Sequence, residues 1–299
     1  MTVIPFDNPF GAPGRWWKGN LHTHTTVSDG ALPPPATARR YRRLGYDFLA
    51  ITDHVKVCEP FEAPAGLLLI PGAEYHTSVG DPVRAWHFVC LGLVGEVTGV
   101  GGPLPGLLAS MRENARFYFA AHPYWSNLAE EDLLAIEGVP AMEVYNGVCE
   151  RAIDRGYSDQ AWDYALACGR RLNALAVDDS HIESDFGRGW IMLRAGRLSM
   201  ETVLDALKRG LYYSTSGPEI FDLRIDGSIV SVRCSPSRSI KFMARSSDGK
   251  YFGARDGELL ESAVYELRGT ETYLRIQVED TAGRRAYTNP LYIKGAGRT

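Results

Sequence analysis

The chain has 299 residues, 45% hydrophobic and 23% charged, enough for one large α/β domain or a barrel with a small appended domain. Its formal net charge of −4 and isoelectric point near 6.0 give no electrostatic signature for binding nucleic acid or an anionic membrane. The apolar runs are far shorter than a membrane span, and residues 1–18 lack signal-peptide features. The five cysteines form no CxxC pair. We therefore expect a cytoplasmic protein.

The first part of the chain alternates between strand and helix patterns. Residues 33–45 have prolines in the first helical turn and a glycine at the end, which predicts a helix. Apolar runs that end in charged residues are typical of strands buried on both faces of a parallel sheet. We predict strands over 17–25, 46–54, 67–74, 86–93 and 117–122.

The alternation continues to about residue 209. Further strands are predicted over 141–146, 172–179 and 190–194, and helices over 104–115, 129–136, 159–168 and 200–209. Strands and helices that alternate in this way predict an α/β fold, either a (β/α) barrel or a closely related parallel architecture. The strands carry their polar residues at the C-terminal end, which is the face where the active sites of such barrels lie.

Beyond about residue 216 the sequence pattern changes. Short alternating or apolar runs are separated by Asp-Gly, Ser-Ser-Asp-Gly and Thr-Ala-Gly turns, which predicts antiparallel strands joined by hairpins. These strands are predicted over 220–225, 229–233, 240–244, 263–266 and 273–278. We therefore expect a barrel over 1–215 and a small C-terminal all-β extension over 216–299, without catalytic residues of its own.

The histidines indicate where a functional site lies, because all seven are within the first 181 residues. His22 and His24 end the first predicted strand, and residues two apart on a strand point to the same side. Two imidazoles on rigid backbone are a natural half-site for a divalent metal, and Asp29 in the following turn can add an oxygen ligand. Taken alone, this pair is also explained as a polar strand end.

The later strand ends repeat the arrangement. Further candidate ligands stand at or near the ends of successive strands: His54, Glu74, His87, His122, Asp179 and His181. One zinc ion usually takes four ligands, so this larger set, with a carboxylate able to bridge, suits two or three metal ions. Asp53 and Asp178 would face away from the neighbouring ligands, and we interpret them as residues that orient ligands or as capping residues.

Six segments resemble the motifs of the PHP (polymerase and histidinol phosphatase) family; in chain order they are LHTHTTVSDG, ITDH, GAEYHT, WHFVCLG, AHPYW and DDSH. The resemblance covers residues 17 to about 210, and the phrases EVYNG and FGRGW resemble its carbaryl-hydrolase-like metallohydrolase branch. It implies a distorted (β/α)7 TIM-like barrel that binds two or three divalent ions, Zn, Mn or Fe.

Carried over position by position, the resemblance implies three groups of metal ligands. The first is His22, His24, Glu74 and Asp179; the second shares Glu74 and adds His87 and His122; the third is Asp29, His54 and His181. Asp29 stands where some members of the family have histidine, so a weaker or different third metal is an open alternative.

His76 is an alternative to His87, because it lies two residues from Glu74 on the same side of the strand. We favour His87 as the ligand, since a strand histidine at the matching position is a feature of the family, and His76 as a polar neighbour or a substrate contact. Tyr124, Tyr145 and Asn146 stand beside strand ends and are candidates for shaping the pocket.

The expected chemistry follows from the metals. Hydroxide held between two divalent ions can attack a phosphoryl or carbonyl centre, so no protein nucleophile such as the serine of a GxSxG motif is needed. We expect a phosphoesterase acting on a small phosphoester or nucleotide, with Arg188 as a candidate phosphate clamp, although a solvated arginine explains that residue equally well. The alternatives are a hydrolase of a carbamate, ester or amide at the same metals and a non-catalytic metal-binding scaffold.

Overall fold

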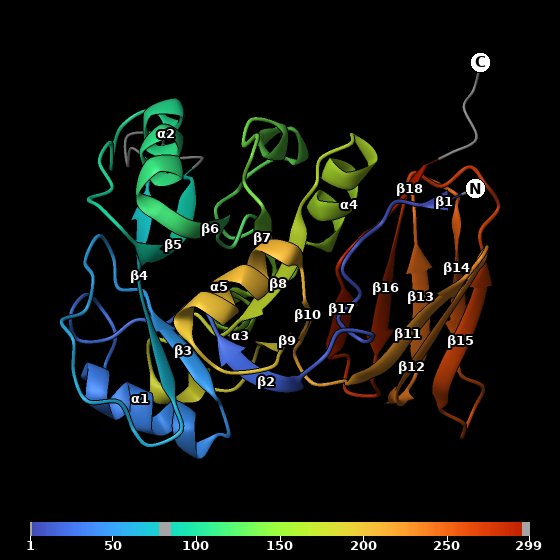
Figure 1. The fold of residues 1–299 in the computed structure, drawn as a ribbon, viewed down its shortest axis with the longest axis horizontal. Coiled ribbons are helices and arrows are strands. Elements are labelled where there is room, and N and C mark those ends of the chain that lie inside the picture. The colour runs from blue at the N-terminus through green and yellow to red at the C-terminus, as the bar shows by residue number, and fades with distance from the viewer. Residues whose placement is uncertain (1, 78–84, 295–299) are drawn as a thin grey trace.

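The structure is a computed structural model that describes residues 2–77 and 85–294. It is a mixed α/β molecule with one large mixed sheet and a separate three-stranded antiparallel sheet. In Figure 1 the helices gather around the strands on the left, and the strands of the C-terminal part stand together on the right.

Eight strands build the α/β part of the large sheet. They are β2 (Arg15–Asn20), β3 (Phe48–Ile51), β4 (Leu68–His76), β5 (His87–Leu93), β6 (Ala115–Ala120), β7 (Ala141–Asn146), β8 (Asn173–Val177) and β9 (Trp190–Ala195). Their order in the sheet is β9-β2-β3-β4-β5-β6-β7-β8. All of them overlap predicted strands.

The strand directions differ from the parallel arrangement that the sequence predicts. β2, β3 and β4 are parallel to one another, as are β6, β7 and β8, but β5 is antiparallel to both of its neighbours and β9 is antiparallel to β2. The prediction is therefore wrong for β5 and β9. A buried strand has the same apolar pattern in either direction, so this pattern carries no information about which way a strand runs.

Hydrogen bonds beyond the strand ends bring β8 next to β2. The His24 amide donates to the Ser180 carbonyl over 3.0 Å, and the Asp179 amide donates to the His22 carbonyl over 3.0 Å. Thr23 and Ser180 accordingly form a parallel bridge. Two motifs 157 residues apart in the sequence, HTH and DSH, thus lie side by side.

Five α-helices flank this sheet: α1 (Pro34–Arg43), α2 (Leu104–Asn114), α3 (Gly147–Ile153), α4 (Asp159–Ala167) and α5 (Met200–Arg209). Four of them were predicted. Residues 129–136, predicted as a helix, form only a short 3-10 helix at Glu130–Leu134. The unpredicted α3 begins immediately after β7, where the Asn146 side chain accepts a hydrogen bond from the Cys149 amide and caps the helix.

The C-terminal part consists of strands. They are β10 (Tyr212–Thr215), β11 (Ile220–Asp226), β12 (Ile229–Ser237), β13 (Ser239–Met243), β14 (Gly249–Gly253), β15 (Leu260–Glu266), β16 (Tyr273–Glu279), β17 (Arg285–Thr288) and β18 (Leu291–Lys294). β11, β12 and β15 form the separate sheet, and the others extend the large one. The predicted antiparallel strands are confirmed, while β10, β14, β17 and β18 were not predicted.

The N-terminal segment packs against the C-terminal part. β1 (Thr2–Val3) pairs with β18, and the Asn8 side-chain amide donates to the Leu223 carbonyl over 2.8 Å. Figure 1 accordingly shows β1 beside β18. The division of the chain at residues 215 and 216 stays a prediction.

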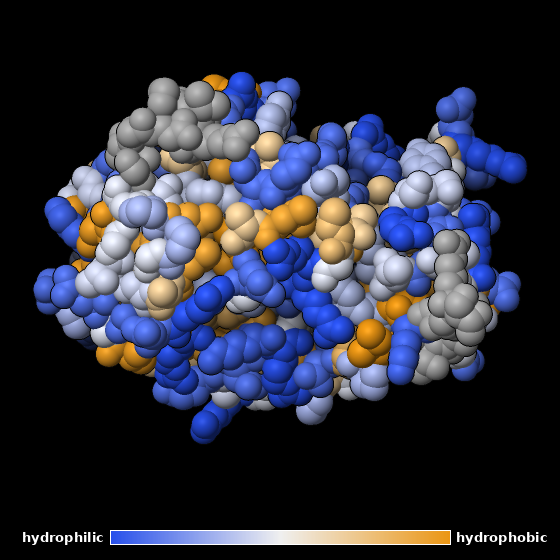
Figure 2. Space-filling view, turned by 90° about the horizontal axis from the view of Figure 1, so that it is seen from above, coloured by the Kyte–Doolittle hydropathy of each residue, from blue (hydrophilic) through white to orange (hydrophobic). Residues whose placement is uncertain are grey.

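No helix within the described ranges is long and apolar enough to cross a membrane. The face of the molecule shown in Figure 2 is largely hydrophilic, and its apolar residues gather mainly in a band over the α/β part.

Candidate metal centre

The candidate ligands meet at the edge where the parallel strands end. His22 and His24 follow β2, His54 follows β3 and pairs with Glu74 of β4, and His122 follows β6. The direction of β5 explains its contribution: since β5 is antiparallel, its first residue lies at the edge where its neighbours end. That first residue is His87, so the strand that departs from the predicted direction still delivers its histidine to the site.

Two of the ligand positions have unusual backbone conformations. His122 has a φ of 25° and Asp179 a φ of 52°, values that cost a residue other than glycine about 1–3 kcal/mol. Specific hydrogen bonds hold both, since the His122 amide donates to Glu143 Oε2 over 2.8 Å and the Asp179 amide donates to the His22 carbonyl. Strained residues held in this way cluster at functional sites.

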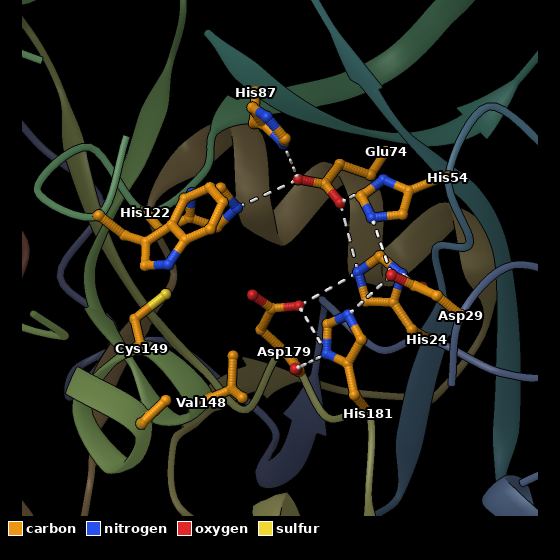
Figure 3. Close-up of a pocket in the computed structure, with 12 residues that line it drawn as sticks. His24, Asp29, His54, Glu74, His87, His122, Val148, Cys149, Asp179 and His181 are labelled. Atoms are coloured by element: carbon orange, nitrogen blue, oxygen red, sulfur yellow. Dashed lines mark hydrogen bonds and ion pairs between the residues drawn. The ribbon is translucent and has the colours of Figure 1, made fainter. Parts of the chain in front are cut away.

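The first predicted group forms a compact set of nitrogen and oxygen atoms. His22 Nε2 and His24 Nε2 are 3.1 Å apart. Each lies 3.3 Å from Glu74 Oε2, and their distances to Asp179 Oδ1 are 3.4 and 3.1 Å. Tetrahedral ligands about 2.0–2.1 Å from a zinc ion lie about 3.3–3.4 Å from one another. His22, His24 and Glu74 therefore have the spacing of neighbouring ligands of one metal ion, and Asp179 lies at a similar distance from both histidines (Figure 3 shows all of these residues but His22).

One oxygen of each carboxylate in this group lacks a hydrogen-bond donor. Glu74 Oε2 and Asp179 Oδ1 are buried and have no hydrogen-bond partner, although both residues are nearly inaccessible to solvent. A buried carboxylate oxygen without a donor is costly, because it has lost its hydration without compensation. A divalent cation held by the two facing ring nitrogens would supply positive charge next to such an oxygen, so these residues fit a bound metal.

The second predicted group is built around the other Glu74 oxygen. His87 Nδ1 lies 2.8 Å and His122 Nε2 3.2 Å from Glu74 Oε1. Burial lowers the pKa of His87, which favours the neutral form that binds metals. His76 is placed differently, since its Nδ1 donates to the Thr77 carbonyl and it does not line the pocket. The geometry thus favours His87 over His76 as the ligand, as the sequence did.

The third predicted group lies nearer the solvent. Asp29 Oδ2 is 3.4 Å from both His54 Nε2 and His181 Nε2, and Asp29 Oδ1 is 3.2 Å from His24 Nδ1. Their atoms are close enough for His24, Asp29, His54 and His181 to hold one ion together. His54 also places Nδ1 3.1 Å from Glu74 Oε2, which connects this group to the first.

Charge dominates the protonation of the buried histidines. Burial lowers the pKa of His22, but the carboxylates of Asp179, Glu143 and Glu74 outweigh it and raise this pKa to about 10. Burial lowers the pKa of His24 as well, but the neighbouring carboxylates of Asp179, Asp29 and Glu74 raise it well above its usual value. Although burial opposes ionisation, the surrounding imidazoles lower the pKa of Glu74 well below its usual value. The cluster is therefore rich in anionic oxygens that attract cations.

Glu143 is a contributor that sequence reasoning missed. It is buried in β7, where its Oε1 lies 2.7 Å from His22 Nδ1 and its Oε2 accepts from the His122 amide and from the Asn146 side chain. Asn146 in turn donates to Asp179 Oδ2 over 3.0 Å. A carboxylate that binds the outer nitrogen of a histidine directs the inner nitrogen at a metal. Its signal in the sequence was a glutamate within an otherwise apolar strand.

Asp53 and Asp178 are the two carboxylates that were expected to face away from the site, and both cap loops. Asp53 accepts from the amides of Thr25 and Ser28, within the loop that carries Asp29. Asp178 accepts from three successive amides, at residues 187–189. Burial raises the pKa of Asp178 to about 6, against these hydrogen bonds.

The ligand cluster forms one wall of a cavity of about 300 Å³, at the small end of ligand pockets. The other wall is made of Trp125, Val148, Cys149 and Ala152. Arg188 does not line this cavity; its Nε donates to the Ser184 carbonyl over 2.8 Å. Tyr124 and Tyr145 also lie outside the lining, while Asn146 reaches Asp179 from behind it.

Comparison with known proteins supports the fold. No family model and no curated protein matches the sequence. Among solved structures, the chain is similar to a two-domain protein from Bacteroides vulgatus ATCC 8482 that contains a predicted PHP-like metal-dependent phosphoesterase. The TM-score is 0.53 at 16% identity, over 97% of this chain and 100% of that one. The chain thus shares a PHP-like fold, in agreement with the resemblance of its motifs.

Two further solved structures match less of the chain. One is an unverified metal-dependent phosphoesterase from Bifidobacterium adolescentis ATCC 15703, with a TM-score of 0.41, 16% identity and coverage of 64% of this chain and 96% of that one. The other is an amidohydrolase from Chromobacterium violaceum, with a TM-score of 0.38, 17% identity and coverage of 56% and 88%.

Proposed function

We propose that the protein is a metal-dependent phosphoesterase that cleaves a small phosphoester at a centre of two or three divalent ions, Zn, Mn or Fe. The observation that carries this proposal is the pair of buried carboxylate oxygens, Glu74 Oε2 and Asp179 Oδ1, that face ring nitrogens at 3.1–3.4 Å and have no hydrogen-bond donor. The PHP-like fold, which we interpret as a distorted seven-stranded barrel closed between β2 and β8, supports it.

In this proposal each group of side chains has a separate task. The nine candidate ligands would hold the ions, and the ions, when bound, would supply Lewis acidity and an activated water. Glu143 keeps His22 in the orientation that presents Nε2 to the centre. The loop-capping Asp53 positions the segment that carries Asp29. Arg188 remains a candidate for binding phosphate only after a change of its side-chain position.

The second candidate is a hydrolase of a carbamate, ester or amide at the same ions. One observation favours it: none of the described residues that line the pocket is a lysine or an arginine, so only the ions would offer positive charge to a phosphate. A carbonyl substrate needs no further cation, because only one oxygen becomes negative as it reacts.

The test is hydrolysis by metal-loaded protein. Elemental analysis first establishes the bound ions, and p-nitrophenyl phosphate is then compared with an aryl carbamate and an aryl ester under the same conditions. We expect faster hydrolysis of the phosphate. Turnover of the carbamate or ester alone would replace the phosphoesterase proposal with the second candidate, and a protein that binds no metal would leave only a scaffold role.

A matched pair of variants tests the ligand assignment. His87→Ala should lose metal from the second group and most of the activity, whereas His76→Ala should keep the metal content of the unmodified protein, since His76 bonds Thr77 and lies outside the pocket. Metal content per chain is the measurement. The reverse result would exchange the roles of the two histidines.

A further inference from the structure

The wall opposite the ligands is apolar. Val148 and Ala152 are four residues apart and therefore share one face of α3, and Cys149 lies beside them. Figure 3 shows Val148 and Cys149 directed toward the same cavity as the ligand cluster. Burial raises the pKa of the Cys149 thiol, so this side chain stays neutral and behaves as a small apolar group.

Trp125 completes this wall and ties it to one end of the ligand cluster. Its indole ring contacts the His122 ring edge-on, with centroids 5.0 Å apart, and the His87 ring with centroids 5.9 Å apart. The side chain is 42% exposed, so part of the ring remains free to contact a ligand. The apolar wall thus adjoins the group formed by Glu74, His87 and His122.

The cationic side chains near this wall are already engaged elsewhere. Arg151 Nε donates to Asp185 Oδ1 over 2.6 Å, and Arg155 Nη1 donates to Asn127 Oδ1 over 2.9 Å. The described lining of the pocket also contains no lysine or arginine. If a substrate carried a second negative charge beside this wall, that charge would have no cationic partner. An unpaired charge beside an apolar wall loses hydration and gains nothing in return.

We propose that Trp125, Val148, Cys149 and Ala152 form the subsite for the non-reacting part of the substrate, and that this part is a small uncharged apolar group, such as one aromatic ring. This inference rests on the proposed function, because it requires the reacting phosphoryl group to be held at the ligand cluster. It favours an aryl or alkyl phosphomonoester over a nucleotide, whose additional charges and polar base this wall does not match.

The test measures binding, so that it does not depend on turnover. Calorimetry of the metal-loaded protein compares 3-phenylpropylphosphonate with 3-carboxypropylphosphonate, which share the phosphonate and the three-carbon spacer, and inorganic phosphate serves as the reference for the reacting group. The phenyl compound should bind at least about tenfold more tightly than the carboxylate, as expected for an apolar pocket that rejects a charge. Equal binding, or tighter binding of the carboxylate, would overturn the subsite.

A matched pair of variants on α3 locates the effect. Ala152→Lys adds a cation to the wall at a solvent-exposed position and should bring the ratio of the two affinities close to one or reverse it. Ile153→Lys adds the same charge at the next residue, which is 52% exposed and does not line the pocket, and should leave the ratio unchanged. An unchanged ratio in Ala152→Lys, with normal metal content, would also overturn the subsite.

Failure of the proposed function has a different signature. If inorganic phosphate and both phosphonates fail to bind, the phosphoester proposal is wrong. The ratio of affinities is then measured with the matched phenylpropyl and carboxypropyl hydroxamates, which bind metals through a carbonyl-like oxygen pair. A preference for the phenyl hydroxamate would keep the apolar subsite for a carbonyl substrate, and a ratio near one would overturn it.

Discussion

Two clusters of buried charge in this molecule differ in how they are completed. Between α4 and β16, the buried Arg275 donates through Nε and Nη2 to the two oxygens of Asp163, each over 2.6 Å, and its guanidinium lies 4.6 Å from the Trp162 ring. In the candidate metal centre, Glu74 and Asp179 each keep a buried oxygen without a donor.

The difference shows which cluster is complete within the chain. A bidentate arginine–carboxylate pair satisfies both partners and joins the α/β part to the C-terminal strands. The candidate metal centre brings nine candidate ligands from separate strand ends and loops around two oxygens that lack a hydrogen-bond donor, which is a poor arrangement for stability alone and a suitable one for binding cations. The two clusters should therefore respond differently to the loss of one carboxylate.

The largest effect on stability is expected from Asp163→Ala. Removing one partner of a buried pair leaves Arg275 charged and buried, so the free energy of unfolding should fall by about 3–5 kcal/mol. Denaturant unfolding measures it, with Arg275→Met combined with Asp163→Leu as the control that should recover most of the loss. Metal content per folded chain should not change; a loss of metal would show that the two clusters are not independent.

Glu74→Gln should reverse this pattern. The amide keeps the shape of the side chain but removes the negative charge that contacts both the first and the second group of ligands. Mutation of a residue that only orients ligands lowers metal affinity by about 10–100-fold, and the loss in Glu74→Gln should be larger. Competition with a chelator measures the affinity. The unfolding free energies of metal-free wild type and variant should differ far less than for Asp163→Ala, and retention of the full metal content would contradict the bridging role.

The gathering of most candidate ligands was predictable from the sequence because most of them stand at or just beyond the end of a recognisable strand pattern. His22, His54 and Asp179 stand at apolar runs that form β2, β3 and β8, and parallel strands necessarily bring such ends to one edge. The direction of β5 was not predictable, since its apolar pattern is the same either way. The sequence placed His87 on this strand, but the expectation that site residues stand at C-terminal strand ends fails for it, because His87 is the first residue of β5.

The residues that escaped prediction act across long separations. Glu143 bonds His22, 121 positions away, and nothing in its own strand indicates that partner. The Arg275–Asp163 pair joins residues 112 positions apart and was likewise invisible. The short strands β14 and β17 lack extended apolar runs, so the sequence pattern did not indicate them. Pairing with neighbouring strands stabilises them. Local patterns report secondary structure, but contacts of this kind depend on the assembled fold.

Glu143→Gln tests the missed residue and should have a smaller effect than Glu74→Gln. The variant keeps an oxygen that can accept from His22 Nδ1 but loses the negative charge behind it, so metal affinity should fall by about 10–100-fold. Chelator competition again measures it. Glu150→Gln, a half-buried glutamate on α3 that lies outside the pocket lining, is the control; equal losses in both variants would contradict a specific role for Glu143.

The dependence of metal affinity on pH also separates the two clusters. In the metal-free protein the pKa of His22 is about 10, against about 6.5 expected in the unfolded chain. Protonation of His22 therefore stabilises the fold fully below about pH 6.5, and this stabilisation is lost as the pH rises through 10. Because a metal displaces that proton, metal affinity should rise by up to about tenfold per pH unit between about 6.5 and 10 for each proton released.

Titrations in buffers of different ionisation enthalpy count these protons directly. Asp163→Ala should leave the count unchanged, because Arg275 keeps its charge throughout this range. In Glu143→Gln the pKa of His22 should fall, since one of the carboxylates that raise it is neutralised, and fewer protons should be released at a given pH above neutrality. A metal affinity independent of pH would mean that the metal does not displace the proton from His22. His22 would then no longer belong to the first group of ligands.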